Sequence, residues 1–348
     1  MSIIYSVIIP TLNQAAKLRM CLQHLADLNF DPNCFEVIVT DNGSTDETEL
    51  VAKSYSEKIK RIRYYYCGEP GLMAARHMGC EEAKGEILCY LDDDSLVNKE
   101  WLNGIAESFS EKAVVIATGP CIPKYEIEPP AWLEYFWEKT TFGRKCSFLS
   151  LFDYGNEFKM IPPVNVYGCN FSIRKKIFLE YGGTLPDYYP EKYRVYTGNG
   201  ESGLTFKLQN NGFLAAYNQK SRIEHFIPSS RLTLDYFCSR RYFNGIHESY
   251  HDVRKRNGLH SDQVLSLNNK TLHTIRQNIR QPLRWLKRYI FWFFRAIKSP
   301  EVASMKMKLE ESYYAGYAFH QKSLQKDSKL LEWVLRKNYM GDNGKLPI

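Results

Sequence analysis

The sequence predicts an α/β fold, a mostly parallel sheet with flanking helices, followed by a largely helical C-terminal region. Up to about residue 119, short runs rich in β-branched and aromatic residues alternate with stretches of helical periodicity, as in parallel sheets with crossover helices. Residues 120–163 interrupt that alternation with prolines and aromatic residues. From residue 230 onward, the pattern is typical of helices.

Five runs are expected to form strands: Tyr5–Ile9, Phe35–Thr40, Ile62–Tyr66, Ile87–Leu91 and Val114–Thr118. Leucines at helical spacing from Leu18 to Leu28 predict a helix after the first run. Ser44 and Glu47 have the spacing of a capping box and predict the start of the next helix. Residues 71–84 and 98–109 supply two further crossover helices.

The chain has 348 residues, more than the ~250 to 300 at which one hydrophobic core usually stops growing. We therefore expect a large domain over residues 1–229, built from halves of about 1–119 and 120–229, and a helical region over 230–348. Residues 120–163 are expected to form an irregular insertion that lies over the sheet.

Composition excludes several classes of protein. Hydrophobic residues make up 44% and charged residues 24% of the chain, which excludes a mostly disordered protein. No apolar run approaches the roughly 18 to 20 residues of a membrane span, and the run over residues 3–9 is too short for a secretion signal. Nine cysteines without regular spacing indicate reduced, mostly buried thiols in a cytosolic protein.

Polar side chains follow three of the predicted strands. Thr11 and Asn13 come after the first strand, Asp41 after the second, and Asp92 to Asp94 after the fourth. Because ligands of open parallel sheets bind beyond the carboxyl ends of the strands, these side chains are expected to meet at one edge.

Asp92, Asp93 and Asp94 are three consecutive carboxylates, and each raises the pKa of the next unless a cation is present. A divalent metal is the natural partner. In an extended backbone Asp92 and Asp94 point the same way, so that one coordinates the ion and the other contacts a hydroxyl. The alternative is a solvated turn or a helix N-cap.

A glycine-containing turn, residues 68–71, leads into a helix that carries Arg76. A cation and helix N-terminal amides at the same edge suit an anionic ligand. Alternatively, Arg76 is a surface residue that pairs with Glu69 or Glu81.

Taken together, the motifs resemble glycosyltransferase family 2, whose fold is the Rossmann-like GT-A fold. The order and spacing of four segments agree with that family: SVIIPTLN at 6–13, FEVIVTDNGSTD at 35–46, ARHMG at 75–79 and LDDD at 91–94. Similarity continues through GCNFSIR at 168–174 and GESGL at 200–204 to Glu224 and His225, and so covers roughly the first 230 residues. The joint pattern is more specific than any one segment.

The resemblance implies a transferase that moves a sugar from a nucleotide diphosphate to an acceptor hydroxyl, with inversion at the anomeric carbon. UDP is the expected donor nucleotide. By this resemblance the loop from Pro10 to Asn13 and Asp41 belong to the nucleotide-sugar site: Thr11 and Asp41 would hold the nucleobase, and Arg76 would support the nucleotide. Residues 1–119 would form the nucleotide-sugar half and residues 120–229 the acceptor half.

The acidic run receives separate roles from the same resemblance. Asp92 would contact the ribose, Asp93 would belong to the donor site, and Asp94 would ligate Mn²⁺ or Mg²⁺ through the DxD motif. His225 lies where similar enzymes often place a histidine near the metal, and an imidazole beside carboxylates favours manganese over magnesium. The alternative for His225 is an ordinary packed or hydrogen-bonded histidine.

Glu201 is the candidate catalytic base, the group that removes the acceptor proton as the new bond forms. Relatives carry an acidic pair in this segment, whereas this chain keeps one acid. The alternative is a glutamate favoured by the helix dipole. Arg241, next to Arg240, is expected to clamp the pyrophosphate, with a helix-surface pair as the alternative.

Positive charge is concentrated in one segment. The chain has 46 basic and 39 acidic residues, a net charge of +7, and residues 276–299 alone hold seven basic residues and no acidic one. Apolar residues at helical spacing and flanking aromatic rings make this segment a basic amphipathic helix. We expect peripheral binding to an anionic membrane surface on the inner face, or else packing inside the protein, and no nucleic-acid partner.

The sequence therefore predicts a cytoplasmic, inverting, metal-dependent glycosyltransferase that acts on a glycan or lipid-linked glycan acceptor. The single acid at Glu201 leaves open a catalytically silent nucleotide-sugar binding or scaffold protein. A sugar-phosphate nucleotidylyltransferase is disfavoured, because the residues after the first strand, 10–14, do not supply the glycine-rich basic loop of that class.

Overall fold

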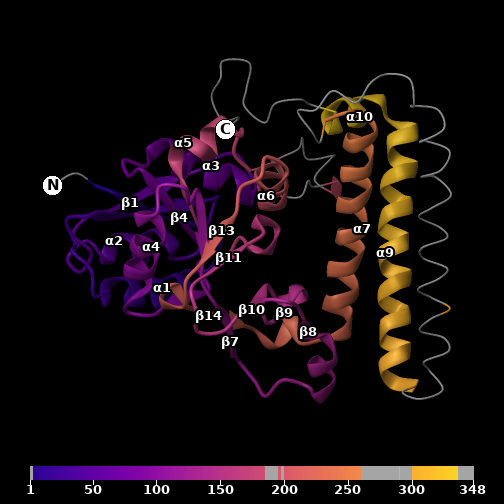
Figure 1. Cartoon of the computed structure of the whole chain (residues 1–348), viewed down its shortest axis with the longest axis horizontal. Helices are drawn as coiled ribbons and strands as arrows, with labels where there is room; N and C mark the ends of the chain where they lie inside the picture. The colour runs from indigo at the N-terminus through magenta and orange to yellow at the C-terminus, as the bar shows by residue number, and fades with distance from the viewer. Residues whose placement is uncertain (1–2, 185–194, 197–199, 260–289, 291–299, 336–348) are drawn as a thin grey trace.

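The computed structural model describes residues 3–184, 195–196, 200–259, 290 and 300–335. Figure 1 shows an α/β body on one side and a pair of long helices on the other. The main sheet has eight strands in the order β11-β13-β6-β12-β4-β1-β2-β3. Strands β1 (Tyr5–Thr11), β2 (Phe35–Asp41), β3 (Ile62–Tyr66) and β4 (Ile87–Leu91) are parallel neighbours, which confirms the predicted mostly parallel sheet.

The central strands form where the sequence has continuous apolar runs, because both faces of a parallel sheet are covered. Every residue of β1, β2 and β4 is buried. Their register brings Thr11 opposite Asp41 at the carboxyl ends of β1 and β2. The other strands of the main sheet are β6 (Ile116–Thr118), β11 (Lys159–Ile161), β12 (Asn170–Arg174) and β13 (Ala215–Tyr217).

The predicted crossover helices are present. Helix α1 buries Leu18, Leu22 and Leu25 through their helical spacing. Gly79 of α3 packs directly on Ile8 of β1, where an added Cβ would collide with the isoleucine side chain. The helices around the sheet are α1 (Ala15–Ala26), α2 (Thr48–Ser54), α3 (Leu72–Glu82), α4 (Trp101–Ser110), α5 (Lys175–Glu180) and α6 (Gly200–Asn210).

The predicted capping box is wrong. Helix α2 begins at Thr48, and its first free amide is satisfied by Asp46, whose Oδ1 accepts from Thr48 N at 3.0 Å. Ser44 faces the other way, and its Oγ accepts from Asn13 N at 2.8 Å. The hydroxyl therefore joins two loops at the sheet edge instead of capping a helix.

The expectation of an irregular insertion over residues 120–163 is only partly right, because the loops and 3₁₀ turns of this segment are interrupted by short strands. Four short strands of this segment enter a second sheet of six strands in the order β5-β14-β7-β10-β9-β8, and β11 joins the main sheet. Strand β7 pairs with β14, far away in sequence, whereas β8, β9 and β10 pair within the segment. These strands are too short to show a periodic pattern in the sequence. The strands are β5 (Ser95–Val97), β7 (Cys121–Tyr125), β8 (Glu138–Lys139), β9 (Arg144–Cys146), β10 (Leu151–Asp153) and β14 (Ile223–Ile227).

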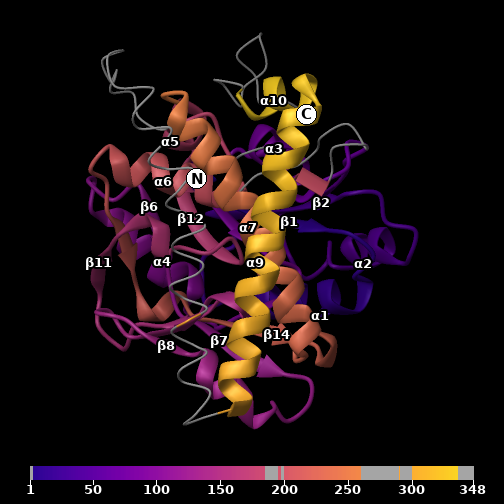
Figure 2. The same ribbon diagram turned by 90° about the vertical axis from the view of Figure 1, so that its right-hand side faces the viewer.

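The C-terminal region is helical, as predicted. Helices α7 (Leu234–Arg256) and α9 (Pro300–Lys326) lie side by side along most of their length, and α10 (Ser328–Val334) closes one end of the pair (Figures 1 and 2). Gly245 and Gly316 allow the close approach, because a Cβ at either position would collide with the backbone of the other helix.

The second sheet and the helical pair share one apolar cluster. Leu133 and Phe136 of the 120–163 segment pack with Phe237 of α7 and Leu309 of α9 in the same core. The predicted boundary between residues 229 and 230 falls in the short 3₁₀ turn Ser229–Arg231, and it stays a prediction.

No helix in the described part of the chain is long and apolar enough to span a membrane. All nine cysteines are free and seven are buried, as the sequence predicted. The basic segment 276–299 lies outside the described residues except for Ile290.

Candidate functional site

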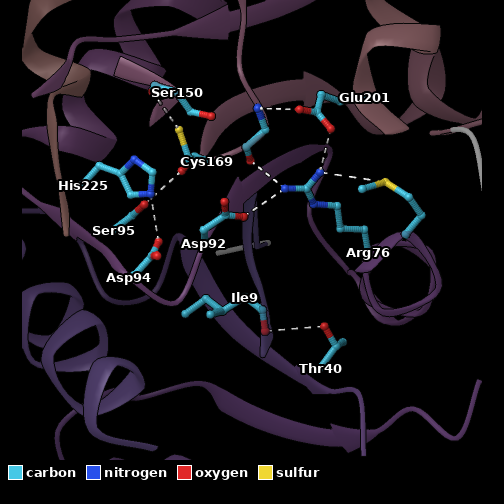
Figure 3. A network of polar contacts seen from close by, with 12 residues as sticks. Ile9, Thr40, Arg76, Asp92, Asp94, Ser95, Ser150, Cys169, Glu201 and His225 are labelled. Atoms are coloured by element: carbon cyan, nitrogen blue, oxygen red, sulfur yellow. Dashed lines mark hydrogen bonds and ion pairs between the residues drawn. The ribbon is translucent and has the colours of Figure 1, made fainter. Parts of the chain in front are cut away.

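The acidic run after β4 forms a turn and not the extended backbone that was predicted. Ser95 N donates to Asp92 O at 3.1 Å, which reverses the chain between them. The carboxylates of Asp92 and Asp94 therefore have different partners (Figure 3). The N–H of Asp92 and the Ser95 hydroxyl both donate to the carbonyl of Cys169, so the turn is fixed to the start of β12.

Arg76 joins two carboxylates from separate parts of the chain. Its Nη2 lies 2.9 Å from Asp92 Oδ1, and its Nη1 lies 3.3 Å from Glu201 Oε2. The side chain is 1% exposed, so it is not the surface residue of the alternative interpretation. Nη2 also donates to the carbonyl of Gly168, whose N–H donates to Glu201 Oε1 at 3.1 Å. The sequence-predicted Arg76, Asp92 and Glu201 thus form one network, drawn in Figure 3.

Charge and burial compete at Arg76 and Asp92. Burial alone would lower the pKa of Arg76, but the charges of Asp92 and Glu201 raise it above its ordinary value. Burial raises the pKa of Asp92, and Arg76 opposes that rise. The guanidinium is therefore the cation that allows carboxylates to gather here.

Asp94 and His225 form a second, adjacent cluster. His225 Nε2 lies 3.2 Å from Asp94 Oδ1, and Arg231 Nη1 lies 3.3 Å from Asp94 Oδ2. Burial alone would raise the pKa of Asp94, but the hydrogen bond and charge of His225, with Arg231, hold it below its ordinary value. Burial alone would lower the pKa of His225, but Asp94 raises it to about 9.

Asp93 links the acidic turn to β1. The hydroxyl of Thr11 donates to Asp93 Oδ2 at 2.7 Å. The pKa of Asp93 is raised to about 7, mainly by burial and to a smaller extent by the negative charge of Asp94. The loops after β1 and β4 are therefore in direct contact, as the prediction of a shared edge requires.

The loops after β1 and β2 are joined in the same way. Asp41 is buried, with Oδ2 accepting from Tyr64 OH at 2.7 Å and Oδ1 accepting from Ser44 N at 2.8 Å. Asn13 Oδ1 accepts from Thr45 N at 2.8 Å. Pro10 lies within buried β1, opposite Thr40 of β2.

Arg241 lies outside this network. Its guanidinium pairs with Glu310 at 3.3 Å and covers the ring of Tyr313 at 4.4 Å, and both partners belong to α9. The arginine that reaches the acidic turn is Arg231. No motif marks Arg231 in the sequence, because its place depends on β14 pairing with β5, which brings the chain after His225 back to Asp94.

Asp94 and His225 fit a divalent cation as part of its ligand set. Among the described residues no group of three or more His, Cys, Asp or Glu side chains is arranged to hold an ion. The pair nevertheless offers a carboxylate oxygen and a buried imidazole, which suit Mn²⁺. Phosphate and water oxygens commonly complete such sites, so two protein ligands are enough when a diphosphate is bound.

A mostly parallel sheet with a polar edge at the carboxyl ends of its strands defines an α/β class of ligand-binding domain. A family model described as glycosyl transferase family 2 matches residues 6–182, about half of the chain. The chain therefore belongs to glycosyltransferase family 2.

Curated relatives resemble parts of the chain. Glycosyltransferase AglE of Haloferax volcanii is 33% identical over 115 residues, which are 33% of this chain and 38% of AglE. Glucosyl-dolichyl phosphate glucuronosyltransferase of the same organism is 20% identical over 220 residues, 63% of this chain and 67% of the relative. The chain thus matches less than two fifths of the length of AglE.

One solved structure is similar over most of the chain. Mannosyltransferase PcManGT from Pyrobaculum calidifontis, in complex with GDP-Man and Mn²⁺, has a TM-score of 0.57 and 15% identity. The alignment covers 92% of this chain and 87% of PcManGT. This similarity confirms the GT-A fold expected from the sequence.

Proposed function

We propose that the chain is an inverting, metal-dependent glycosyltransferase that moves a sugar from a nucleotide diphosphate, UDP by default, to a hydroxyl of a glycan or lipid-linked glycan. One observation carries the proposal. Asp92 and Glu201, from two separate segments, lie in one network with Arg76 at the carboxyl edge of the sheet, and Asp94 lies in the adjacent cluster with His225. Family membership and the GT-A fold agree with it.

The donor nucleotide would lie along the edge formed by the loops after β1, β2 and β4. Thr11 and Asp41 would hold the nucleobase, with Pro10 and Asn13 shaping the loop beside it. Asp92 would contact the ribose. Arg76 would support this arrangement by holding the carboxylate of Asp92 in place through an ion pair.

Asp94 and His225 would hold the cation, Mn²⁺ or Mg²⁺, near the diphosphate. When bound, the ion would offset the negative charge that develops on the departing diphosphate. Arg231 already contacts Asp94, and its guanidinium has the geometry to bind phosphate oxygens in two places. We assign to Arg231 the pyrophosphate role that the sequence gave to Arg241.

Glu201 would act as the base. In an inverting transfer the acceptor hydroxyl attacks the anomeric carbon from the side opposite the diphosphate, and its proton must leave as the bond forms. Glu201 is one-quarter exposed, and Arg76 together with the N–H of Gly168 fixes its carboxylate. A fixed and accessible carboxylate beside the donor edge supports this role.

Two variants separate donor binding from chemistry. Asp94→Ala is expected to lose the metal-dependent part of UDP binding, and Glu201→Gln is expected to keep binding while transfer falls by about 100-fold or more. Isothermal titration with UDP and Mn²⁺ measures binding, and UDP release from a panel of UDP-sugars measures turnover. Equal turnover in Glu201→Gln and the unmodified protein would remove Glu201 from the mechanism.

The same experiment tests the alternative of a silent nucleotide-sugar binding protein. Such a protein would bind UDP and release none from any donor, with or without Mn²⁺. Turnover by the unmodified protein therefore excludes the binding-only function.

We also propose that the basic segment 276–299 attaches the enzyme peripherally to an anionic membrane surface, where a lipid-linked acceptor would lie. Each cation near such a surface contributes about 1 kcal/mol. Co-sedimentation with vesicles that contain an anionic phospholipid, at low and high salt, tests it. Absence of binding at low salt would contradict membrane attachment and leave the transferase function untouched.

A further inference from the structure

Two described residues, one on each side of Glu201 in the sequence, pack against the C-terminal helical pair. Five residues before Glu201, Tyr196 stacks on Phe319 of α9, with ring centroids 5.5 Å apart and an interplanar angle of 13°. Five residues after it, Phe206 of α6 meets His251 of α7 edge to face, with centroids 5.3 Å apart. Figure 1 shows α6 on the side of the α/β body that faces α7.

Tyr196 is part of the packing of the helical region itself. Its ring also lies 5.9 Å from that of His320 and packs against the apolar cluster that includes Tyr250, Leu324 and Leu330. Aromatic contacts of this kind contribute about 0.5 to 1.5 kcal/mol beyond the area they bury. The contact is therefore strong enough to hold a local segment, and too weak to decide whether the whole domain folds.

Glu201 is sensitive to movement of its own element. It is the second residue of α6, and its carboxylate is held by Arg76 at 3.3 Å and by the N–H of Gly168 at 3.1 Å. Gly200, just before it, has a positive φ of 39° and lies against Met73. Because a helix moves as a unit, a shift of about 1 Å at α6 would take the carboxylate out of this geometry, which can lower a rate about 100-fold.

We propose that the C-terminal helical pair positions the catalytic carboxylate, with Tyr196 and Phe206 as the two positioning residues. The inference rests on the proposed function, because it assigns a purpose to the geometry of Glu201. It gives α7 and α9 a part in the transfer step, although neither helix supplies the base.

Substitution of either ring in the Tyr196–Phe319 stack tests the proposal. Tyr196→Ala and Phe319→Ala are each expected to lower kcat for UDP release about 10-fold or more, while KM for the donor and the Kd for UDP stay within about twofold. Tyr196→Phe keeps the ring and is expected to restore kcat. Phe319 is 38% exposed, so its substitution preserves the fold even if Tyr196→Ala does not.

A matched control and an independent readout complete the test. Phe243→Ala removes a 39% exposed aromatic ring from α7 and is expected to leave kcat unchanged. Amide hydrogen exchange of α6 is expected to accelerate in Tyr196→Ala and Phe319→Ala only, because the segment opens locally. In a Glu201→Gln background, Phe319→Ala should cause no further loss of kcat.

The outcomes distinguish this inference from the proposed function. Unchanged kcat in both alanine variants, or a rise in KM alone, would overturn the positioning role while the transferase function stands. Loss of kcat in Tyr196→Phe equal to that in Tyr196→Ala would also overturn it. If the unmodified protein released no UDP, the proposed function would fail, and unchanged exchange of α6 would then overturn the contact's role as well.

Discussion

Arg231 occupies one carboxylate oxygen of Asp94, with its Nη1 3.3 Å from Oδ2. The other oxygen faces His225. Both oxygens therefore have positively charged or donor partners in this structure. We expect a cation bound at Asp94 to displace Arg231 from the carboxylate, so that the guanidinium can turn toward the phosphates.

This exchange predicts a difference between two arginines. Arg231→Gln is expected to weaken UDP binding in Mn²⁺ about 10-fold, because a hydrogen bond to a charged group contributes about 1.5 to 3 kcal/mol. Arg241→Gln, the matched control, is expected to change the Kd by less than about twofold, since Arg241 pairs with Glu310. Isothermal titration measures both, and an equal or larger effect at Arg241 would contradict this assignment.

The sequence predicted where the polar residues of the site lie in the fold better than it predicted which groups their side chains contact. The polar residues after β1, β2 and β4 could be placed at one edge because strand order follows from apolar runs and parallel connections. The partner of each carboxylate could not be predicted, because the turn at Asp92 to Ser95 and the return of the chain after His225 depend on long-range pairing. Arg231 was missed for that reason.

The helical pair contains a buried histidine that makes its stability depend on pH. His320 of α9 is fully buried and hydrogen-bonded to Ser249 of α7, with Nδ1 and Oγ 2.6 Å apart. The pKa of His320 is lowered to about 4, mainly by burial and to a smaller extent by the charge of His247. The unfolded chain, with an ordinary pKa near 6.5, binds the proton first.

The contribution of neutral His320 to the free energy of unfolding is therefore fully present above about pH 6.5 and is lost as the pH falls toward 4. Between pH 7 and pH 5 this loss amounts to about 2 kcal/mol. Urea unfolding should show the unmodified protein losing about that much more than His320→Gln over the same interval. Identical pH dependence in the two proteins would show that His320 titrates alike folded and unfolded.

Helices and strands were predicted correctly where their sequence pattern is local and long enough to show a period. Strands β3 and β4 lie where the apolar runs placed them, and α1 buries the predicted leucines. The strands of the segment 120–163 were missed because they are two to five residues long, too short to show a period, and β7 pairs with β14 across a large sequence separation. The contact of Asp46 with Thr48, and not a capping box, starts α2.

The whole molecule is held together by an aromatic cluster that spans the predicted domain boundary. Phe237 of α7 is fully buried and meets Trp132, Phe136 and Phe148, with centroids 5.2, 5.1 and 4.5 Å away. Residues before and after the boundary at 229 and 230 therefore share one core. The positioning of Glu201 by the helical pair requires such a rigid connection.

A single substitution tests this connection. Phe237→Ala is expected to lower the free energy of unfolding by about 3 to 5 kcal/mol, the usual effect of truncating a buried phenylalanine. Tryptophan fluorescence and circular dichroism should still report one coincident transition in urea. Two separate transitions, or a loss below about 1 kcal/mol, would show that the helical pair is an independent unit.

In the function that we propose, Asp94 and His225 hold a cation beside a diphosphate at the carboxyl edge of the sheet. A crystal structure of the protein with UDP and Mn²⁺ tests this most directly. We expect an ion bound by Asp94, His225 and the diphosphate, the uracil beside Thr11 and Asp41, and Arg231 moved from Asp94 to the phosphates. An ion or nucleotide at another place, with Asp94 still paired to Arg231, would contradict the claim.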